Sequence, residues 1–335
     1  MVLADTPITL GVRFPPGAPD APVLSPDERD HVHLRLRALL PGAEIVVLAT
    51  CQRTEALLVG VTIDEAITAW HAALELALAA RPRCLVAPAD PYVHVGPDAL
   101  RHACRVACGL DSAIVGESDI GAQLRAAHHA ADALGTLGPV TRRLLRTAFA
   151  TGKAARAKTG IGAASRGASA AAARVVEQRR PGAGVVVVGT GIAAKGVLRH
   201  LSRTDRPVTV LGRDRGRAHR LASFAGVSWG MLGELDVALQ HAGALVVAVP
   251  GPSPVVANAL ARSPHRARHL LVVDMGAPPS VRPLGGIELV TLADLMCPVI
   301  DEDVRTAVPM VEALIDRACR AMGASRRDVA VRGRA

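Results

Sequence analysis

Hydrophobic and polar positions in the first 160 residues follow the patterns of strands and amphipathic helices. Apolar runs bounded by turn residues predict three strands, at Ile8–Phe14, Glu44–Ala49 and Ala56–Val61. After a loop rich in Pro and Gly, Ser25 can cap a helix whose first position is Pro26. A second helix is expected over residues 64–79. A helical pattern then fills residues 96–158, with breaks near Gly109, Gly116 and residues 135–139.

The pattern changes after the turn Pro181-Gly182-Ala183-Gly184, beyond which apolar runs alternate with helical stretches. The runs predict four strands, at residues 185–188, 208–211, 245–249 and 270–274. One helix is expected directly after the first of these strands and another over residues 215–224. Such alternation predicts an α/β fold with a parallel, doubly wound sheet. A single helix over residues 301–322 and a frayed basic tail are expected to end the chain.

Composition bears on location. Half of the residues are apolar and the mean hydropathy is +0.28, much of which alanine explains. No stretch approaches the roughly 18 uninterrupted apolar residues that a membrane-spanning helix needs. The N-terminus lacks the basic start and apolar run of a secretory signal. We therefore predict a cytoplasmic protein with no membrane segment.

The six cysteines are scattered along the chain, which argues against a disulfide framework in a reducing compartment. Cys104 and Cys108 lie near His102, and such a group can bind a metal ion. Their C-x3-C spacing has no second pair of ligands, so we predict no metal site.

The net charge of +9 is concentrated in residues 141–180. This basic segment contains one acid, Glu177, and ten cationic residues, Arg142, Arg143, Arg146, Lys153, Arg156, Lys158, Arg166, Arg174, Arg179 and Arg180. Such a segment can attract a polyanion, or it can be a solvated arginine-rich helix face, and charge alone does not decide between them. Because aromatic residues make up only 2% of the chain, any nucleic acid would be held mainly through its phosphates.

A glycine-rich turn follows the four valines at 185–188 and opens a helix. It reads Gly189, Thr190, Gly191, Ile192, Ala193 and Ala194. In a dinucleotide-binding turn the first glycine makes the bend, the second lets the pyrophosphate approach, and the small third residue lets helix and strand pack closely. The amides at the helix N-terminus then bind the phosphates. We therefore predict a nicotinamide-dinucleotide site, with a plain turn of an α/β protein as the alternative.

The next strand ends in Arg213, Asp214 and Arg215. A site that prefers NAD carries an acid here to hold the ribose hydroxyls, whereas cations suit a 2′-phosphate. Arg213 and Arg215 therefore favour NADP(H), although Asp214 lies between them.

Cys51 follows directly after the strand at 44–49, and the end of a strand is a usual place for a reactive group in a sheet protein. Arg53 is a candidate source of the positive charge that stabilises a thiolate. The alternative is a buried structural cysteine beside an exposed ion pair. With a nicotinamide cofactor, however, a thiolate can capture an acyl group as a thioester, which hydride then reduces to an aldehyde.

These segments together resemble the glutamyl-tRNA reductase family, which catalyses the first committed step of the five-carbon route to tetrapyrroles. VVLATCQRTEALLV is similar to the catalytic-cysteine segment of the family, and RHACRVACGLDSAIVGESDIGAQLRAA is similar to its helical signature. LLRTAFATGKAARAKTGIGAASRGAS resembles the basic stretch before the cofactor domain. VVVVGTGIAAKGV, VLGRDRGRAHRLA and LLVVDMGAPPSV resemble parts of the NADPH domain. The resemblance runs in chain order over most of the sequence.

The resemblance implies roles for the matching residues. Cys51 would attack the α-carbonyl ester of glutamyl-tRNA, and NADPH would reduce the thioester to glutamate-1-semialdehyde. Thr50 and Arg53 would bind the glutamyl group, and His102 would carry a proton or orient the acceptor end. The residues implied to shape the substrate pocket are Ser112, Glu117 and Gln123. The basic segment would contact tRNA, and glutamate-1-semialdehyde aminomutase is a further partner that the resemblance suggests.

The resemblance also implies the division into domains. A catalytic, substrate-binding α+β domain would occupy residues 1–160, and a Rossmann-like NADP(H) domain would occupy residues 161–296. Residues 297–335 would be the remnant of a spinal helix and dimerisation region, which leaves homodimer formation open.

The sequence departs from the family pattern at two positions near the implied site. Gln52 replaces the usual asparagine, and Asp119 replaces a glutamine of the signature. Two alternatives to a working glutamyl-tRNA reductase therefore stay open. One is a paralogue that reduces another acyl donor, and the other is a catalytically silent NADP-binding regulator of tetrapyrrole synthesis.

Overall fold

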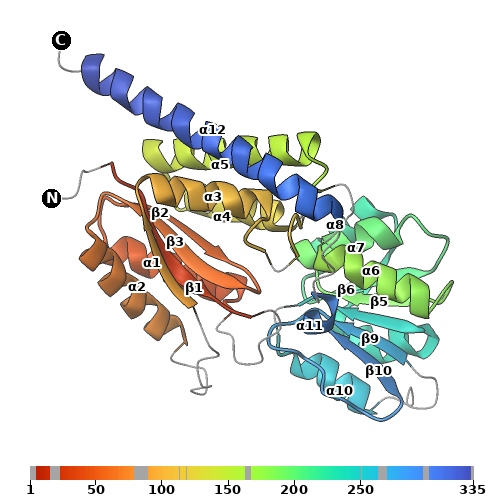
Figure 1. Cartoon of the computed structure of the whole chain (residues 1–335). Helices are drawn as coiled ribbons and strands as arrows, with labels where there is room; N and C mark the ends of the chain where they lie inside the picture. The colour runs from red at the N-terminus through yellow and green to blue at the C-terminus, as the bar shows by residue number, and fades with distance from the viewer. Residues whose placement is uncertain are drawn as a thin grey trace. The chain divides into compact units, whose positions relative to one another are not determined.

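The computed structural model describes residues 5–15, 23–78, 90–112, 114–117, 119–162, 167–249, 251–262, 270–296 and 302–332, with the side chains of the last range described from 304 to 323. The described residues form two compact units (Figure 1). The first contains residues 5–14, 24–162 and the C-terminal helix, and the second consists mainly of residues 167–296.

The first unit is built on a sheet in the order β2-β3-β1-β4, in which the pairs of strands are antiparallel. Its strands are β1 (Ile8–Arg13), β2 (Glu44–Ala49), β3 (Arg53–Val59) and β4 (Asp90–Val95). Its helices are α1 (Pro26–Leu39), α2 (Ile63–Leu78), α3 (Pro97–Cys108), α4 (Asp119–Ala133), α5 (Pro139–Lys158) and α12 (Glu302–Arg332).

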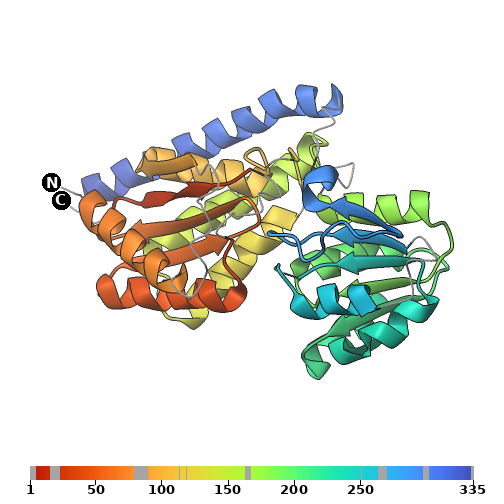
Figure 2. The same ribbon diagram turned by 90° about the horizontal axis from the view of Figure 1, so that it is seen from below.

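Helices cover both faces of this sheet (Figures 1 and 2). Successive residues of a strand point to opposite faces, so β2 supplies two cores. Ile45 and Val47 pack with α1 and α2, whereas Val46 and Leu48 pack with α3, α4 and α5. Because both faces are buried, β2 from Ile45 to Ala49 and β3 from Ala56 to Val59 are continuous apolar runs rather than alternating patterns.

Helix α1 begins as the sequence predicts. Ser25 Oγ accepts a hydrogen bond from the Glu28 amide at 3.2 Å, and the Glu28 carboxylate accepts one from the Ser25 amide at 2.7 Å. This reciprocal capping box satisfies two backbone donors that the helix itself leaves unpaired.

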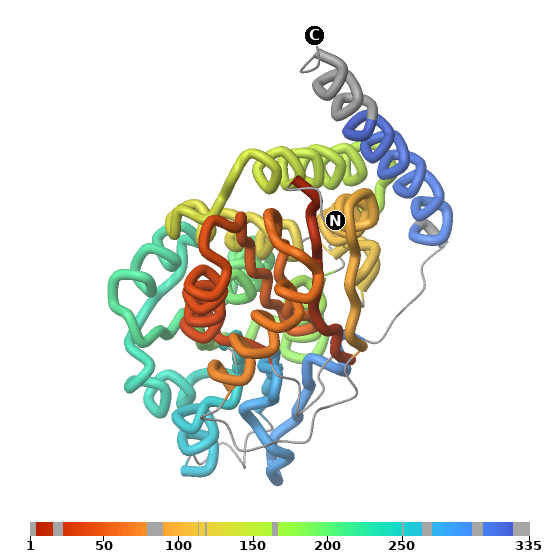
Figure 3. The backbone as a smooth tube through the Cα atoms, turned by 90° about the vertical axis from the view of Figure 1, so that its left-hand side faces the viewer, coloured from red at the N-terminus to blue at the C-terminus, as the bar shows by residue number. Residues whose placement is uncertain are grey.

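The C-terminal helix α12 packs on the first unit, along α3 and α5 (Figure 3). Its residues Ala307, Val311 and Ile315 are buried in the same core as α3 and α5. Arg105 of α3 forms an ion pair with Glu312 of α12. The predicted end of this helix at Met322 is wrong, since the helix continues to Arg332.

The second unit is a parallel sheet in the order β10-β9-β8-β5-β6-β7. Its strands are β5 (Val185–Val188), β6 (Val208–Gly212), β7 (Ser228–Met231), β8 (Ala244–Val247), β9 (Leu270–Asp274) and β10 (Ile287–Thr291). Its helices are α6 (Ala168–Arg179), α7 (Ile192–Leu201), α8 (Arg215–Ala225), α9 (Leu235–Ala238), α10 (Pro254–Arg262) and α11 (Leu292–Leu295).

Helices lie on both faces of the second sheet as well. Val185 and Val187 pack with α6, α7 and α8, and Val186 and Val188 pack with α9 and α10. The strand order is that of a Rossmann-like sheet, which places the nucleotide site where the order reverses, after β5. The predicted α/β class and doubly wound sheet are confirmed.

The structure also corrects several details. Strand β3 begins at Arg53 rather than Ala56, because Thr50 and Arg53 close a tight hairpin through a backbone hydrogen bond of 2.8 Å. Strand β4 and the edge strands β7 and β10 were not predicted. Their inward positions are few, so they lack the long apolar runs that mark a central strand.

Candidate active site

Cys51 lies at the tip of the hairpin between β2 and β3, where the expected end of a strand is found. Thr50 Oγ1 accepts hydrogen bonds from the amides of Gln52 and Arg53, both at 3.1 Å. The Gln52 carbonyl accepts a hydrogen bond from the Phe14 amide at 2.8 Å, which ties the tip to the end of β1. These contacts fix the backbone on both sides of Cys51, which is itself half-buried.

The Arg53 side chain is buried, with an exposed fraction of 1%. Its Nη2 donates to the backbone oxygen of Asp111, and its Nη1 lies 4.0 Å from Glu55 Oε2. Nη1 is buried and has no hydrogen-bond partner in the described part of the chain. The ion pair of Arg53 with Glu55 is therefore internal rather than exposed, and the guanidinium keeps one unused donor.

Glu55 is the centre of a buried polar network. Its Oε2 accepts a hydrogen bond from the Tyr92 hydroxyl and lies 2.8 Å from His102 Nε2. Although burial opposes ionisation, the charge and hydrogen bond of His102 hold the pKa of Glu55 at about 2. Burial together with Glu55 raises the pKa of Tyr92, so the phenol stays a donor.

His102 is buried on α3 with carboxylates near both ring nitrogens. Besides Glu55 at Nε2, it has Asp111 Oδ2 at 3.7 Å from Nδ1. The ring stacks on His94 of β4 with centroids 4.6 Å apart. Its position joins α3 to the sheet through the network that also holds Arg53.

Glu117 is buried, with an exposed fraction of 7%. Burial raises its pKa to about 7, against the opposing effect of a hydrogen bond with Ser112. Burial and the charge of Glu117 in turn raise the pKa of Cys51 to about 12, with a smaller effect from Asp119. The thiol is therefore protonated at neutral pH, and the main groups that shift its pKa do not include Arg53, the cation expected to stabilise the thiolate.

Asp119 begins α4, and Gln123 follows it by four positions. Residues four apart lie on one face of a helix, so half-buried Gln123 shares the face of Asp119, whose charge acts on Cys51. Hydrogen bonds and electrostatic interactions therefore link five of the predicted site residues in the first unit, Thr50, Cys51, Arg53, Ser112 and Glu117. Gln123 is linked to them only through the helix face that it shares with Asp119.

In the second unit, the glycine-rich turn links β5 to α7. Gly189 has φ of +123°, and a Cβ there would lie 2.3 Å from the Ala248 carbonyl oxygen. A Cβ on Gly191 would meet nothing within 4 Å, which leaves open space over the backbone. No side chain caps α7 at Gly191, and Ala194 is fully buried. The turn therefore offers free amides at a helix N-terminus, as a pyrophosphate site requires.

The Asp214 carboxylate caps the N-terminus of α8, which engages it within the protein. Its Oδ1 accepts a hydrogen bond from the Arg217 amide at 2.7 Å, which lowers the pKa of the carboxyl. Arg213 and Arg215 are exposed, and the Arg215 guanidinium lies 5.6 Å from the centroid of the Trp229 ring. The acid between the two arginines therefore serves the helix, and the end of β6 remains cationic.

The basic segment 141–180 is divided between the two units. Arg142 pairs with Asp132 at 2.6 Å, and Arg179 and Arg180 pair with Glu288 at 2.7 and 2.8 Å. Arg166 lies outside the described residues. The exposed cations of α5 are Arg142, Arg146, Lys153 and Lys158.

Sequence reasoning missed the network of Glu55, Tyr92 and Asp111. One signal was present, since Arg53 and Glu55 are two apart and run directly into the apolar residues 56–59, so that as parts of one strand they share a face of the sheet. Their partners His102 and Tyr92 lie 47 and 37 positions from Glu55, and that pairing needs the fold.

Two absences apply only within the described ranges. Across them, no three His, Cys, Asp or Glu side chains are grouped so that they could hold a metal ion. Of the helices described, none is both long enough and apolar enough to cross a bilayer.

The second unit has the parallel sheet and glycine turn of a nicotinamide-dinucleotide domain, and the first unit carries a cysteine at a fixed hairpin tip. Residues 22–159 match the family described as glutamyl-tRNA(Glu) reductase, N-terminal domain. Residues 171–297 match the shikimate/quinate 5-dehydrogenase family.

Curated relatives extend this match. The chain is 35% identical over 285 residues to the glutamyl-tRNA reductase of Thermus thermophilus, covering 82% of this chain and 69% of that one. It is 31% identical over 302 residues to glutamyl-tRNA reductase 1 of Nocardioides sp., covering 86% and 69%. For the enzyme of Alcanivorax borkumensis the identity is 32% over 279 residues, covering 80% and 65%. The chain therefore belongs to the glutamyl-tRNA reductase family and spans about two thirds of the length of these relatives.

Among solved structures, the chain is similar to glutamyl-tRNA reductase from Methanopyrus kandleri. The identity is 26%, the match covers 98% of this chain and 82% of that one, and the TM-score is 0.48.

Proposed function

We propose that this protein is a glutamyl-tRNA reductase. It uses NADPH to reduce glutamyl-tRNA(Glu) to glutamate-1-semialdehyde, the first step of tetrapyrrole (porphyrin) biosynthesis by the five-carbon route. The observation that carries the proposal is the hairpin between β2 and β3 of this family member. Cys51 lies at its tip, and two residues later Arg53 is buried with an unused donor. Cys51 forms a thioester with the glutamyl group.

Thioester formation requires Cys51 to lose its proton, because the thiol is the resting form. Glu117 is suited to accept that proton, since its pKa of about 7 lets it exchange protons near neutral pH. The Sγ atom then attacks the α-carbonyl carbon, the bond from that carbon to the tRNA ribose oxygen breaks, and the tRNA leaves as a hydroxyl that takes up the proton. Once Glu117 is neutral, its repulsion of the thiolate also ends.

Arg53 is the proposed binding group for the glutamyl carboxylate. Its buried Nη1 lacks a hydrogen-bond partner in the described structure, and an arginine fork pairs well with a carboxylate. Thr50, Ser112 and Gln123 supply polar groups around the same substrate. The Thr50 side chain acts mainly by fixing the hairpin backbone, since its oxygen already accepts two amide hydrogen bonds.

His102 is proposed as a positioning residue. Its Nε2 is engaged with Glu55, and Glu55 contacts Arg53, so the imidazole holds the guanidinium in place through the carboxylate. The resemblance implies that His102 carries a proton or orients the acceptor end. Because its Nε2 is engaged with Glu55, the role in proton transfer is the less direct of the two.

NADPH is proposed to bind on the second unit. Gly189, Thr190, Gly191, Ile192, Ala193 and Ala194 form the phosphate-binding turn, and Arg213 and Arg215 hold the 2′-phosphate. The uncapped amides of α7 and the open space over Gly191 fit this group. When bound, NADPH supplies the hydride that reduces the acyl group to an aldehyde. A titration should show NADPH binding more tightly than NADH, and equal affinities would contradict the assignment of the arginines.

The tRNA is the proposed macromolecular partner, held by exposed cations of the basic segment that lie on α5, and the protein is proposed to act in the cytoplasm. The test is a single-turnover assay with charged glutamyl-tRNA and NADPH, in which wild type forms the semialdehyde and Cys51→Ser does not. Semialdehyde formation by Cys51→Ser would contradict the proposal. No product from wild type that still binds NADPH would favour a paralogue, with Asp119 as the first residue to examine, or a silent regulator.

A further inference from the structure

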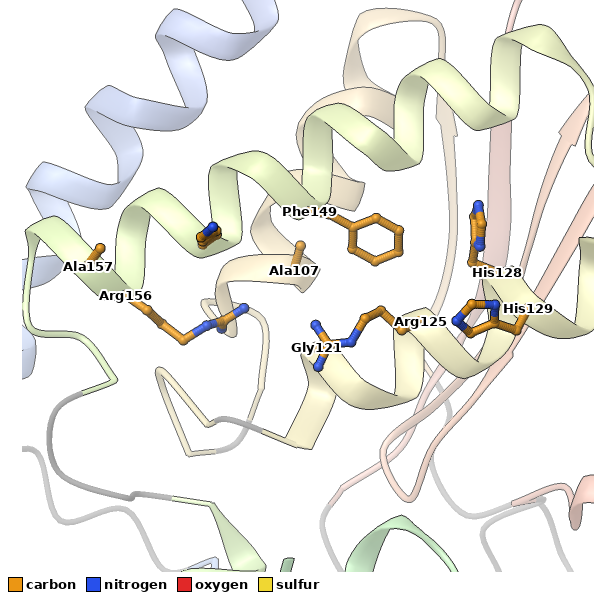
Figure 4. Close-up of a pocket in the computed structure, with 9 residues that line it drawn as sticks. Ala107, Gly121, Arg125, His128, His129, Phe149, Arg156 and Ala157 are labelled. Carbon is orange, nitrogen blue, oxygen red and sulfur yellow. The ribbon is translucent and has the colours of Figure 1, made fainter.

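A pocket of the first unit, separate from the residues around Cys51, lies between α4 and α5 (Figure 4). Its volume is about 690 Å³, within the usual range of ligand sites. The side chains that define its chemistry are Arg125, His128 and His129 of α4 and Phe149, Lys153 and Arg156 of α5. On each helix the lining positions follow the spacing of one face, and they include no carboxylate.

Two guanidinium groups converge at one end of this pocket. Figure 4 shows the Arg125 and Arg156 side chains extending toward each other beside Gly121. A Cβ on Gly121 would lie 3.1 Å from Arg156 Nη2 and 3.7 Å from Arg125 Nη1. Arg156 Nη1 is buried and has no hydrogen-bond partner in the described part of the chain. Two like charges beside an unused donor form an anion site, because an anion would relieve their repulsion and satisfy the donor.

Burial and the neighbouring charge of Arg125 both lower the pKa of Arg156, while the thiol of Cys108 acts in the opposite direction. Lys153, one turn before Arg156 on α5, adds a third cation to the lining. The cationic end is therefore not balanced by an acid of the pocket.

The other end of the pocket is aromatic. The rings of His128 and Phe149 meet edge to face with centroids 5.8 Å apart, and His129 meets His128 at 5.5 Å. Phe149 is half-buried and packs partly on the core, so its ring is held in place. A chain with only three phenylalanines thus places one of them beside three cations. A nucleotide matches these two ends, because it carries a flat base and an anionic phosphate.

We propose that this pocket binds one nucleotide unit of single-stranded RNA, with its phosphate between Arg125 and Arg156 and its base against Phe149 and His128. The proposal rests on the proposed function for the source of that nucleotide, which is the tRNA substrate. A free nucleotide carries the same chemistry and is separated from the tRNA by the test.

The pocket is distinct from the Cys51 site but next to it. Asp119 and Gly121 are two positions apart in the first turn of α4 and so face different sides of the helix. The charge of Asp119 acts on Cys51, whereas Gly121 borders the pocket. A nucleotide bound here would therefore lie across the first turn of α4 from the cysteine.

The test measures binding by the full chain of uncharged tRNA, a short single-stranded RNA, AMP and inorganic phosphate. Arg125→Gln and Arg156→Gln should each weaken tRNA binding and reduce the slope of log affinity against log salt by about 1. Arg125 is exposed, so that variant tests the site even if replacing half-buried Arg156 impairs folding. Phe149→Leu should weaken the binding of RNA and of AMP about tenfold but leave the binding of phosphate unchanged. The matched control is Arg35→Gln, an exposed cation of α1 on the opposite face of the sheet and outside the pocket, which should bind every ligand as wild type does.

The outcomes separate this proposal from the proposed function. If wild type reduces glutamyl-tRNA but the pocket variants bind every ligand as Arg35→Gln does, the pocket proposal is wrong and the function stands. If wild type binds AMP but no tRNA, and Arg125→Gln loses AMP, the nucleotide site stands with a free nucleotide as its source and the tRNA source is wrong. Binding of phosphate alone, without an effect of Phe149→Leu on any ligand, would overturn the nucleotide assignment.

Discussion

A buried arginine needs partners, and Arg53 obtains them from two parts of the first unit. Glu55 lies on the same strand, the Asp111 carbonyl follows α3, and Glu55 is itself held by His102 and Tyr92. Removing one partner of a buried ion pair costs more folding free energy than the intact pair contributes, because the remaining charge stays buried and unpaired. The network therefore fixes the direction of the one donor that Arg53 has left.

The clearest prediction at this scale concerns the thiol of Cys51. Glu117→Gln removes the charge that, after burial, most strongly raises the pKa of Cys51. The pKa of the thiol should therefore fall, which the pH dependence of iodoacetamide alkylation measures. Asp119→Asn is the matched control and should lower it less, because Asp119 is the weaker of the two charges. An unchanged or higher pKa in Glu117→Gln would contradict the proposed proximity of the two groups.

Glu117 also makes a prediction for stability. Its folded-state pKa of about 7 lies above the ordinary 4.5, so folding favours the protonated carboxyl. Its contribution is full below about pH 4.5 and is lost as the pH rises through about 7, a difference of roughly 3 kcal/mol. Glu117→Gln should therefore unfold at a higher temperature than wild type at about pH 8 and at a similar temperature at about pH 4.5. Equal melting temperatures at both pH values would show that Glu117 titrates normally.

At the scale of single elements, the turn from β5 to α7 separates two roles of glycine. Gly189→Ala should disrupt the turn, since its Cβ would lie 2.3 Å from a backbone oxygen and φ is +123°. Gly191→Ala should fold normally, because its Cβ meets no protein atom within 4 Å, yet it should weaken NADPH at least tenfold by blocking the pyrophosphate. Circular dichroism and an NADPH titration check both variants. A folded Gly191→Ala with unchanged affinity would place the phosphates elsewhere.

Helix α12 offers a second test of an element. Ile315 is fully buried in the core with α3 and α5, so Ile315→Ala should destabilise the first unit by about 2–5 kcal/mol. Met310 on the same helix is 52% exposed, and Met310→Ala should cost less than about 0.5 kcal/mol. Hydrogen exchange of the α3 and α5 amides measures both. Equal effects of the two substitutions would mean that α12 does not pack on these helices in solution.

For the molecule as a whole, the sequence predicted what depends on neighbouring residues. The capping box of α1 and the glycine turn after β5 lie within a few positions of each other, and their local chemistry is sufficient to place them. The edge strand β4 was missed because Pro91 and His94 interrupt its apolar positions and half of its residues are exposed. The Glu55 network and the pocket beside Phe149 were missed because each joins residues from different elements.

The charge of the molecule shows the same limit. The sequence counted the basic segment correctly, but it could not show that Arg179 and Arg180 pair with Glu288 or that Arg125, outside the segment, joins Arg156. The division of the segment between two units also needed the fold. A count of cations therefore did not identify which of them are available to an anion.

The central claim is that Cys51 carries the glutamyl group as a thioester, and intact-mass spectrometry tests it most directly. The protein is mixed with glutamyl-tRNA without NADPH, quenched in acid, and mapped by peptide. We predict a glutamyl adduct on Cys51 that hydroxylamine removes, that NADPH discharges as the semialdehyde, and that is absent from Cys51→Ser. Semialdehyde formation with no adduct on Cys51 at any time, or an adduct that Cys51→Ser retains, would contradict the account.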